Sequence, residues 1–157
     1  MLLWFAGMSV LGVLAIFQSP GVDYRLVVAG SVLPVAEGIL GHSWVLHTLL
    51  GAAATLTVIV VATGRRRLLR RRLLGVPIGL FAHLALDGSW ARSRLFWWPF
   101  LGRGFGRSQV PELSRPWLGL LLELGGAAAI GWIWHKFGLT DPARRRRFLE
   151  SGRLDGA

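Results

Sequence analysis

The sequence predicts an all-α integral membrane protein with about five transmembrane helices, and three observations support this fold class. The 157 residues are 53% hydrophobic, and the mean hydropathy of +0.51 is high for a water-soluble domain. Several apolar runs approach the roughly 20 residues that an α-helix needs to cross a bilayer. The net charge of +10 is gathered in blocks of arginine beside these runs, as orientation in a membrane requires. We therefore expect no binding to nucleic acid.

Five segments are predicted to form these helices. Residues 1–17 are almost wholly apolar and lack the basic start and cleavage site of a signal peptide, so we expect a retained helix. Pro20 and Gly21 then break the chain. The other predicted spans are residues 24–40, 43–63, 73–90 and 117–135. Residues 1–140 would form a single transmembrane domain, followed by a polar, basic cytoplasmic tail at 141–157 that could be disordered.

Two blocks of arginine predict the topology. Six arginines lie within Arg65–Arg72 and four form Arg144–Arg147. An excess of arginine marks cytoplasmic segments, and the two spans between these blocks allow both to be cytoplasmic. The N-terminus is then outside, the C-terminus inside, and the loop 91–116 outside. We expect a multi-pass protein of a bacterial-type plasma (inner) membrane, with anionic lipids bound at Arg65–Arg72.

The predicted functional site begins with His83 and Asp87. They are four residues apart, so a helix would place both on one face. The surrounding residues are apolar, and an ionisable pair inside such a segment indicates a functional site. The topology brings further ionisable residues to the same layer under the outer headgroups, with His47 about five residues inside the third span. These residues are Glu37, His42, His47 and Glu123.

This residue set favours a metal centre. Neutral imidazoles and carboxylates bind zinc, manganese or iron, and zinc is the cofactor that we predict. The chain has no cysteine to supply a thiolate. The predicted ligands are His42, His47, His83 and Asp87. A bound metal lowers the pKa of its water toward about 7, and Glu37 or Glu123 would be the general base or a further ligand.

The loop after the fourth span predicts the substrate. Arg92, Arg94 and Arg103 could bind phosphate, because a guanidinium donates two hydrogen bonds in a planar fork. Trp97 and Trp98 belong at the headgroup level, where they could seat a lipid. The predicted substrate is therefore a lipid or lipid-linked phosphate.

Two segments resemble a known family. The run HSWVLHT from His42 to Thr48 resembles the H-R-G-x-T-H-S segment of the YdjM-type inner-membrane metal-dependent hydrolases. His83 to Asp87, with the following LFWWPF at 95–100, is similar to that family's second signature, H-x-x-x-D before a W-P-F run.

The resemblance covers about residues 30–101 and implies metal-dependent hydrolysis at a membrane. It matches the histidines of both segments and the aspartate of the second to the family's motif positions. The family's acidic P-D-x-D segment is only partly kept, as Pro34 to Glu37 with Val35 in place of one aspartate, and Ser43 replaces an arginine. The loss of one acid argues against a site with two metals.

The leading hypothesis is a membrane-embedded metal-dependent hydrolase with an outward-facing interfacial site, acting on a phosphoester or phospholipid-like substrate. The alternative is a non-enzymatic membrane scaffold or partner subunit whose buried polar cluster is structural. A metal or proton carrier is a third possibility. A carrier should set ionisable residues at several depths along a path, whereas here they occupy one layer.

Overall fold

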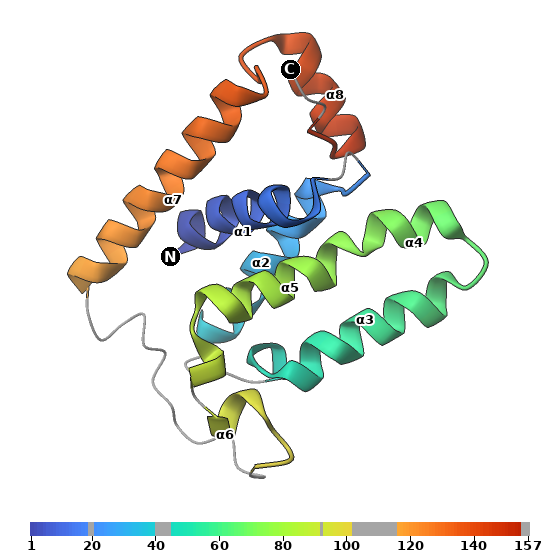
Figure 1. Cartoon of the computed structure of the whole chain (residues 1–157), viewed down its shortest axis with the longest axis vertical. Coiled ribbons are helices and arrows are strands. Elements are labelled where there is room, and N and C mark those ends of the chain that lie inside the picture. Colours follow the sequence, from blue (N-terminus) through green and yellow to red (C-terminus); the bar gives the residue numbers. More distant parts are fainter. Residues whose placement is uncertain (19–20, 40–44, 92, 102–115, 155–157) are drawn as a thin grey trace.

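The computed structural model describes residues 1–18, 21–39, 45–91, 93–101 and 116–154, and the regular structure in these ranges is entirely helical (Figure 1). The longer helices are α1 (Leu2–Phe17), α2 (Tyr24–Ile39), α3 (Leu49–Thr63), α5 (Gly75–Leu86), α7 (Pro116–Lys136) and α8 (Pro142–Ser151). The shorter elements are η1 (Val45–His47), α4 (Arg67–Leu73), η2 (Ser89–Ala91) and α6 (Ser93–Phe96). The predicted all-α class is confirmed.

Five helices lie where the sequence predicts spans, but most are shorter than a bilayer core. α1 and α2 have 16 residues each, and α3 has 15. Sixteen residues cover about 24 Å, against a hydrocarbon core of about 30 Å. Within the described ranges, only Trp117–Lys136 of α7 is long and apolar enough to cross a membrane, with a mean hydropathy of 1.4. Helix length therefore supports one span and not five.

Local structure shortens two of the predicted spans. α3 begins only after Thr48, whose Oγ1 caps the helix by accepting a hydrogen bond from the N–H of Gly51 at 2.9 Å. His47 consequently lies in η1, ahead of the helix, and its predicted position five residues inside a span is wrong. The arginine block is itself helical, as α4, and α5 starts separately at Gly75. In Figure 1, α4 continues the line of α5, and α3 runs beside them.

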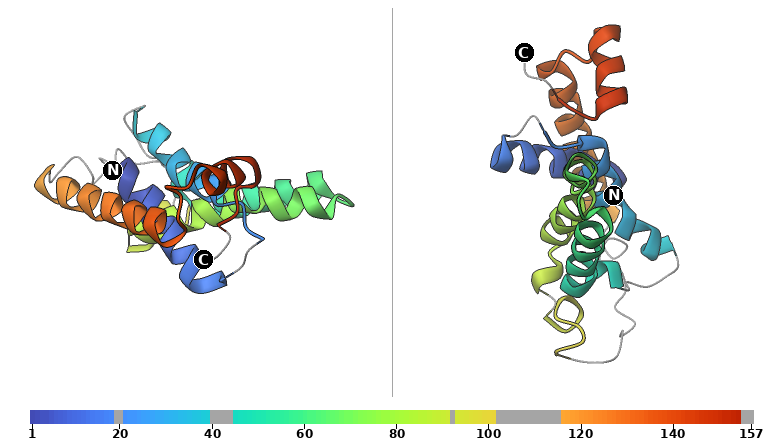
Figure 2. Two further views of the ribbon diagram at one scale, coloured as in Figure 1. Left: turned by 90° about the horizontal axis from the view of Figure 1, so that it is seen from above. Right: turned by 90° about the vertical axis from the view of Figure 1, so that its right-hand side faces the viewer.

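Small residues bring the helices together. α2 and α5 make the most extensive pair, with α1 packed against both, α3 against α5 and α7 against α1 (Figures 1 and 2). A Cβ atom on Gly30 of α2 would lie 2.1 Å from the carbonyl oxygen of Val76 in α5. One on Gly7 of α1 would lie 2.5 Å from the carbonyl oxygen of Gly126 in α7. Such close approach is typical of helix pairs in membranes.

Residues 141–154 of the C-terminal tail are folded, so the prediction that the tail could be disordered is wrong for these residues. Asp141 caps α8 by accepting a hydrogen bond from the N–H of Ala143 at 2.8 Å, and Gly152 ends the helix with a φ of 72°. The N–H of Tyr24 donates to the carbonyl of Gly152 at 2.8 Å. Leu154 is buried in the core cluster of α1, α2 and α7. The two capping residues therefore define α8, and the burial of Leu154 holds this basic segment against the rest of the protein.

The contacts between helices define two ends of the molecule. At one end, Asp23 before α2 pairs with Arg72 of α4 at 2.9 Å, and α8 docks beside them. Both arginine blocks, in α4 and α8, thus belong to this arginine-rich end. At the other end, Glu37 of α2 contacts His47 of η1. The end of α5 lies there too, and this end holds the predicted metal ligands.

Candidate metal centre

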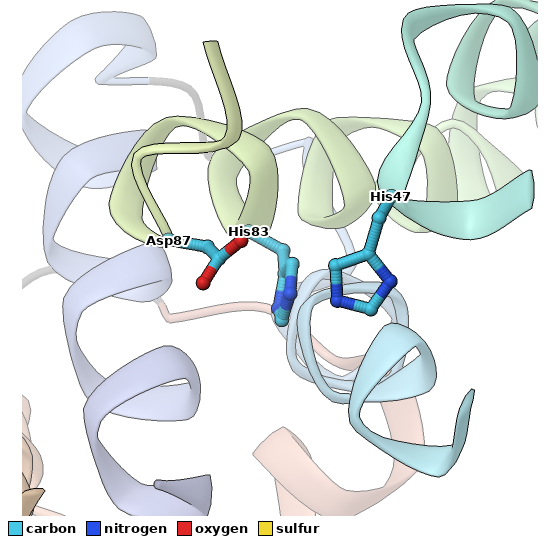
Figure 3. Close-up of side chains that lie close together, drawn as sticks. All are labelled: His47, His83 and Asp87. Atoms are coloured by element: carbon cyan, nitrogen blue, oxygen red, sulfur yellow. The ribbon is translucent and has the colours of Figure 1, made fainter. Parts of the chain in front are cut away.

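Three of the four predicted metal ligands lie together where α5 ends. His47 comes from η1, His83 from the last turn of α5, and Asp87 from the C-terminal cap of α5. One ligand atom from each residue lies within 4.8 Å of those of the other two. Figure 3 shows His83 between His47 and Asp87. Both histidines are buried, and Asp87 is partly buried.

The hydrogen bonds of His83 leave one ring nitrogen available for a metal. Its Nδ1 lies 2.7 Å from the backbone carbonyl oxygen of Ser31 in α2. Because a carbonyl only accepts hydrogen bonds, Nδ1 carries the proton and Nε2 carries a lone pair. Nε2 is buried and has no hydrogen-bond partner among the described residues. A metal-binding histidine typically has this arrangement, with its other nitrogen bound to a carbonyl or a carboxylate.

His47 has a matching arrangement with a carboxylate. Its Nδ1 lies 2.9 Å from Oε2 of Glu37, so the protonated Nδ1 would leave Nε2 as the second metal ligand. The N–H of Leu46 donates to Oε1 of the same glutamate at 3.0 Å. Glu37 therefore holds both the ring of His47 and the backbone beside it. These contacts support a positioning role for Glu37, in place of the predicted general base.

The turn that carries His47 is fixed by its neighbour Thr48. The hydroxyl of Thr48 donates to the carbonyl of Val45 at 2.7 Å while it accepts the N–H of Gly51. Gly51 lies so close to Val45 that a Cβ atom there would be 2.0 Å from the Val45 carbonyl oxygen. The fully buried Thr48 thus determines the path of the chain immediately after His47.

Asp87 is positioned by the end of α5. Its backbone N–H donates to the carbonyl of His83 at 2.8 Å, and its φ and ψ of −74° and −12° continue the helical path. The i, i+4 spacing therefore places both side chains on one face, as predicted. Gly88 follows with a φ of 66° and ends the helix.

Phe5 of α1 is a site residue that sequence reasoning missed. It is fully buried, and its ring stacks on the imidazole of His83 with centroids 4.0 Å apart at 30°. The imidazoles of His47 and His83 meet edge to face, with centroids 5.2 Å apart. His83 is therefore held by Phe5 on α1, a carbonyl of α2 and the ring of His47. An apolar residue on an apolar helix gives no sequence signal for such a role.

Comparisons with protein-family models, curated proteins and solved structures found no match.

Glu123, the other predicted base, has different partners. Its Oε2 accepts hydrogen bonds from the N–H groups of Leu3 at 2.7 Å and Trp4 at 3.3 Å, and its Oε1 lies 3.2 Å from the amino group of Met1. A carboxylate at this position satisfies N–H groups that the first turn of a helix leaves unpaired. Glu123 therefore joins α7 to the start of α1, and these contacts do not support a catalytic role.

The predicted substrate residues are described only in part. Arg94 is exposed in α6, Trp97 is 45% exposed after it, and Trp98 is partly buried. Phe96 packs against the cluster of α3 and α5 formed by Ala52, Leu80 and Leu84. This packing places the aromatic run beside the end of α5. The predicted ligand His42 and the predicted phosphate-binding Arg92 and Arg103 lie outside the described residues.

The donor set fits a transition metal. Two imidazole nitrogens and one carboxylate are a ligand set used by zinc, and one that also suits iron or manganese. Three protein ligands leave a coordination position for water, as catalytic sites require. The strongest single indication is the buried Nε2 of His83, which has no hydrogen-bond partner among the described residues, because leaving such an atom without a partner costs free energy.

Proposed function

We propose that this protein is a membrane-embedded metal-dependent hydrolase in which His47, His83 and Asp87 bind the metal. The observation that carries the proposal is the environment of His83: Nδ1 is bound to a carbonyl and the buried Nε2 has no partner among the described residues. Zinc suits this set best, with manganese or iron as alternatives. When bound, such a metal lowers the pKa of its water toward about 7 and supplies hydroxide at neutral pH.

The protein's own residues would hold this site rigid. Glu37 fixes the ring of His47, the Ser31 carbonyl fixes the tautomer of His83, and Phe5 restricts its rotation. Preorganisation of this kind raises metal affinity and keeps the open position aligned. The proposal also agrees with the resemblance to the YdjM-type hydrolases, since three of the matched motif residues form one group.

We also propose that the protein spans a bacterial-type inner membrane several times, with the metal centre facing outward. The two arginine blocks belong to the end opposite the metal centre, which is the arrangement that the positive-inside tendency favours. Helices of 15 or 16 residues can span where the bilayer thins or where flanking side chains extend to the interface. The helix α5 has only 12 residues, but α4 continues its line (Figure 1).

Cysteine labelling tests this topology directly. The sequence has no cysteine, so L101C, after α6, and E150C, in α8, each create a single exposed thiol. A membrane-impermeant maleimide should label L101C in intact cells and E150C only after permeabilisation. Labelling of E150C in intact cells would contradict the topology.

An apolar groove supports a lipid-like substrate. It lies between α1 and α5 and has a volume of about 450 Å³. Leu86, immediately before Asp87, lines it, and so does Ser9, one helical turn from Phe5. An acyl chain in this groove would leave its headgroup beside the metal centre. The hydroxyl of Ser9 is buried and has no partner among the described residues, so it could donate to an ester oxygen. We propose a phosphoester or phospholipid-like substrate.

Hydrolysis assays test the activity. Detergent-purified protein with added zinc should release product from a chromogenic phosphodiester or from a short-chain phospholipid in mixed micelles. H83A should release none, and H135A should match the wild type, because His135 is exposed in the last turn of α7. Equal release by H83A, or full activity after removal of metal, would contradict the proposal.

The alternative function is a non-enzymatic scaffold, and one observation favours it. His83 joins α5 to α2, and His47 joins η1 to α2 through Glu37, so the cluster also connects elements. For a scaffold, H83A should lower the melting temperature without any change in metal content. For a metal centre, H83A should abolish metal binding, and added zinc should raise the melting temperature of the wild type alone.

A further inference from the structure

A second cavity lies at the arginine-rich end and does not involve the metal centre. Its volume is about 380 Å³, and three separate segments form it: the turn before α2, the helix α4, and the chain around the end of α8. Its lining includes Gly21, Leu68, Arg71, Arg72, Ser151 and Arg153.

The charges of the described residues that line this cavity are unbalanced. Asp23 also lines it, but this carboxylate is 2% exposed and already pairs with Arg25 at 2.8 Å and Arg72 at 2.9 Å. No carboxylate of the described residues pairs with Arg71 or Arg153. Among the described residues, two guanidinium groups therefore face one cavity without an acidic partner, a position in which an anion would be stabilised.

The position of Arg71 depends on a glycine. A Cβ atom on Gly21 would lie 1.8 Å from Nη2 of Arg71, so the guanidinium lies directly against this residue. The absence of a side chain at Gly21 is what allows Arg71 to lie over the turn. Leu68 beside it is 84% exposed and adds an apolar surface at the cavity.

We propose that this cavity binds a phosphate group, with Arg71 and Arg153 as its charged hydrogen-bond donors. The planar fork of arginine suits phosphate oxygens, and both residues lie near the surface that anionic lipids would approach. A phosphate here would connect α4 to the C-terminal segment and so fasten α8 to the rest of the protein. The phosphate could belong to a lipid headgroup or be free in solution.

Two double variants of equal charge test the proposal. R71Q/R153Q removes two of the three cavity arginines and leaves Arg72, which pairs with Asp23, and the control R66Q/R145Q removes two exposed arginines outside the cavity. The melting temperature of each full-length protein in non-ionic detergent is followed as inorganic phosphate or phosphatidylglycerol is added. Affinity should fall about 30-fold in R71Q/R153Q, given about 1 kcal/mol for each of the two arginines, and stay near the wild-type value in the control.

The two ligands distinguish the source of the phosphate. Stabilisation by inorganic phosphate that R71Q/R153Q removes identifies a free-phosphate site, and stabilisation by phosphatidylglycerol alone identifies a lipid site. An equal loss in both double variants would show that only total charge matters and would overturn the proposal. So would the absence of stabilisation by either ligand.

G21A provides a test that leaves the charge unchanged. The added methyl group would displace the Arg71 guanidinium, the end of a flexible side chain, so folding should change little. It should nevertheless weaken phosphate binding. G21A also tests phosphate binding by Arg71 if R71Q/R153Q does not fold. A phosphate affinity in G21A equal to that of the wild type would contradict the proposal that Arg71 binds phosphate.

Discussion

Replacing Glu37 by glutamine tests whether its carboxylate positions a metal ligand. Its two oxygens accept hydrogen bonds from Nδ1 of His47 at 2.9 Å and from the N–H of Leu46 at 3.0 Å. Glutamine has nearly the same shape but one acceptor oxygen and no charge. It must therefore lose one of these bonds and the charge that makes the imidazole a better ligand. Such outer carboxylates contribute about 10- to 100-fold to metal affinity, or about 1.4–2.7 kcal/mol.

The assay is a zinc titration against a fluorescent chelator with detergent-purified protein. The zinc dissociation constant of E37Q should rise by about 10- to 100-fold. E123Q is the matched control, because Glu123 binds the N–H groups of Leu3 and Trp4 and should affect stability without changing zinc affinity. A dissociation constant for E37Q within about twofold of the wild type, well below the range expected for such a residue, would refute the positioning role. An equal rise in E123Q would refute it as well.

Two further predictions concern stability. F5A should lower the free energy of unfolding by about 3–5 kcal/mol, as large-to-small changes at packed sites do. F17A should lower it little, because Phe17 is 52% exposed. SDS-induced unfolding compares the two variants, and equal losses of stability would contradict the stacking role of Phe5. Burial raises the pKa of the Asp23 carboxyl, but hydrogen bonds and charges from Arg25 and Arg72 outweigh it and hold that pKa below its ordinary value. The stability that this carboxylate contributes is therefore present above about pH 4 and is lost as the pH falls through the folded-state pKa. D23N should lower the free energy of unfolding at neutral pH by about 1–3 kcal/mol. It should also reduce the fall in melting temperature as the pH is lowered. An unchanged fall would show that Asp23 does not cause the loss of stability in acid.

The sequence was a good guide to helix positions and to the central residue pair. Apolar runs between breakers such as Pro20 and Gly21 mark the helices, because both features act locally along the chain. The spacing of His83 and Asp87 needs only helical periodicity to bring them together. Charge topology added His47, although this residue lies in the short 3-10 helix η1 and not within an α-helix.

The contacts that orient the ligands could not be predicted in the same way. The carbonyl of Ser31 fixes His83, and every residue carries a carbonyl, so no side-chain pattern indicates it. Glu37 and Glu123 are equivalent in sequence terms, and only helix packing assigns one to His47 and the other to the start of α1. Arginine is a good helix former, so a block read as an orientation signal is also the helix α4.

The most direct test of the account is the metal content of the purified protein. Elemental analysis of protein prepared with zinc and then freed of loosely bound metal should find about one transition-metal ion per chain, as three ligands around one position imply. H83A should contain almost none, and H135A should match the wild type. A wild-type protein without metal, or an H83A protein that keeps it, would contradict the metal centre.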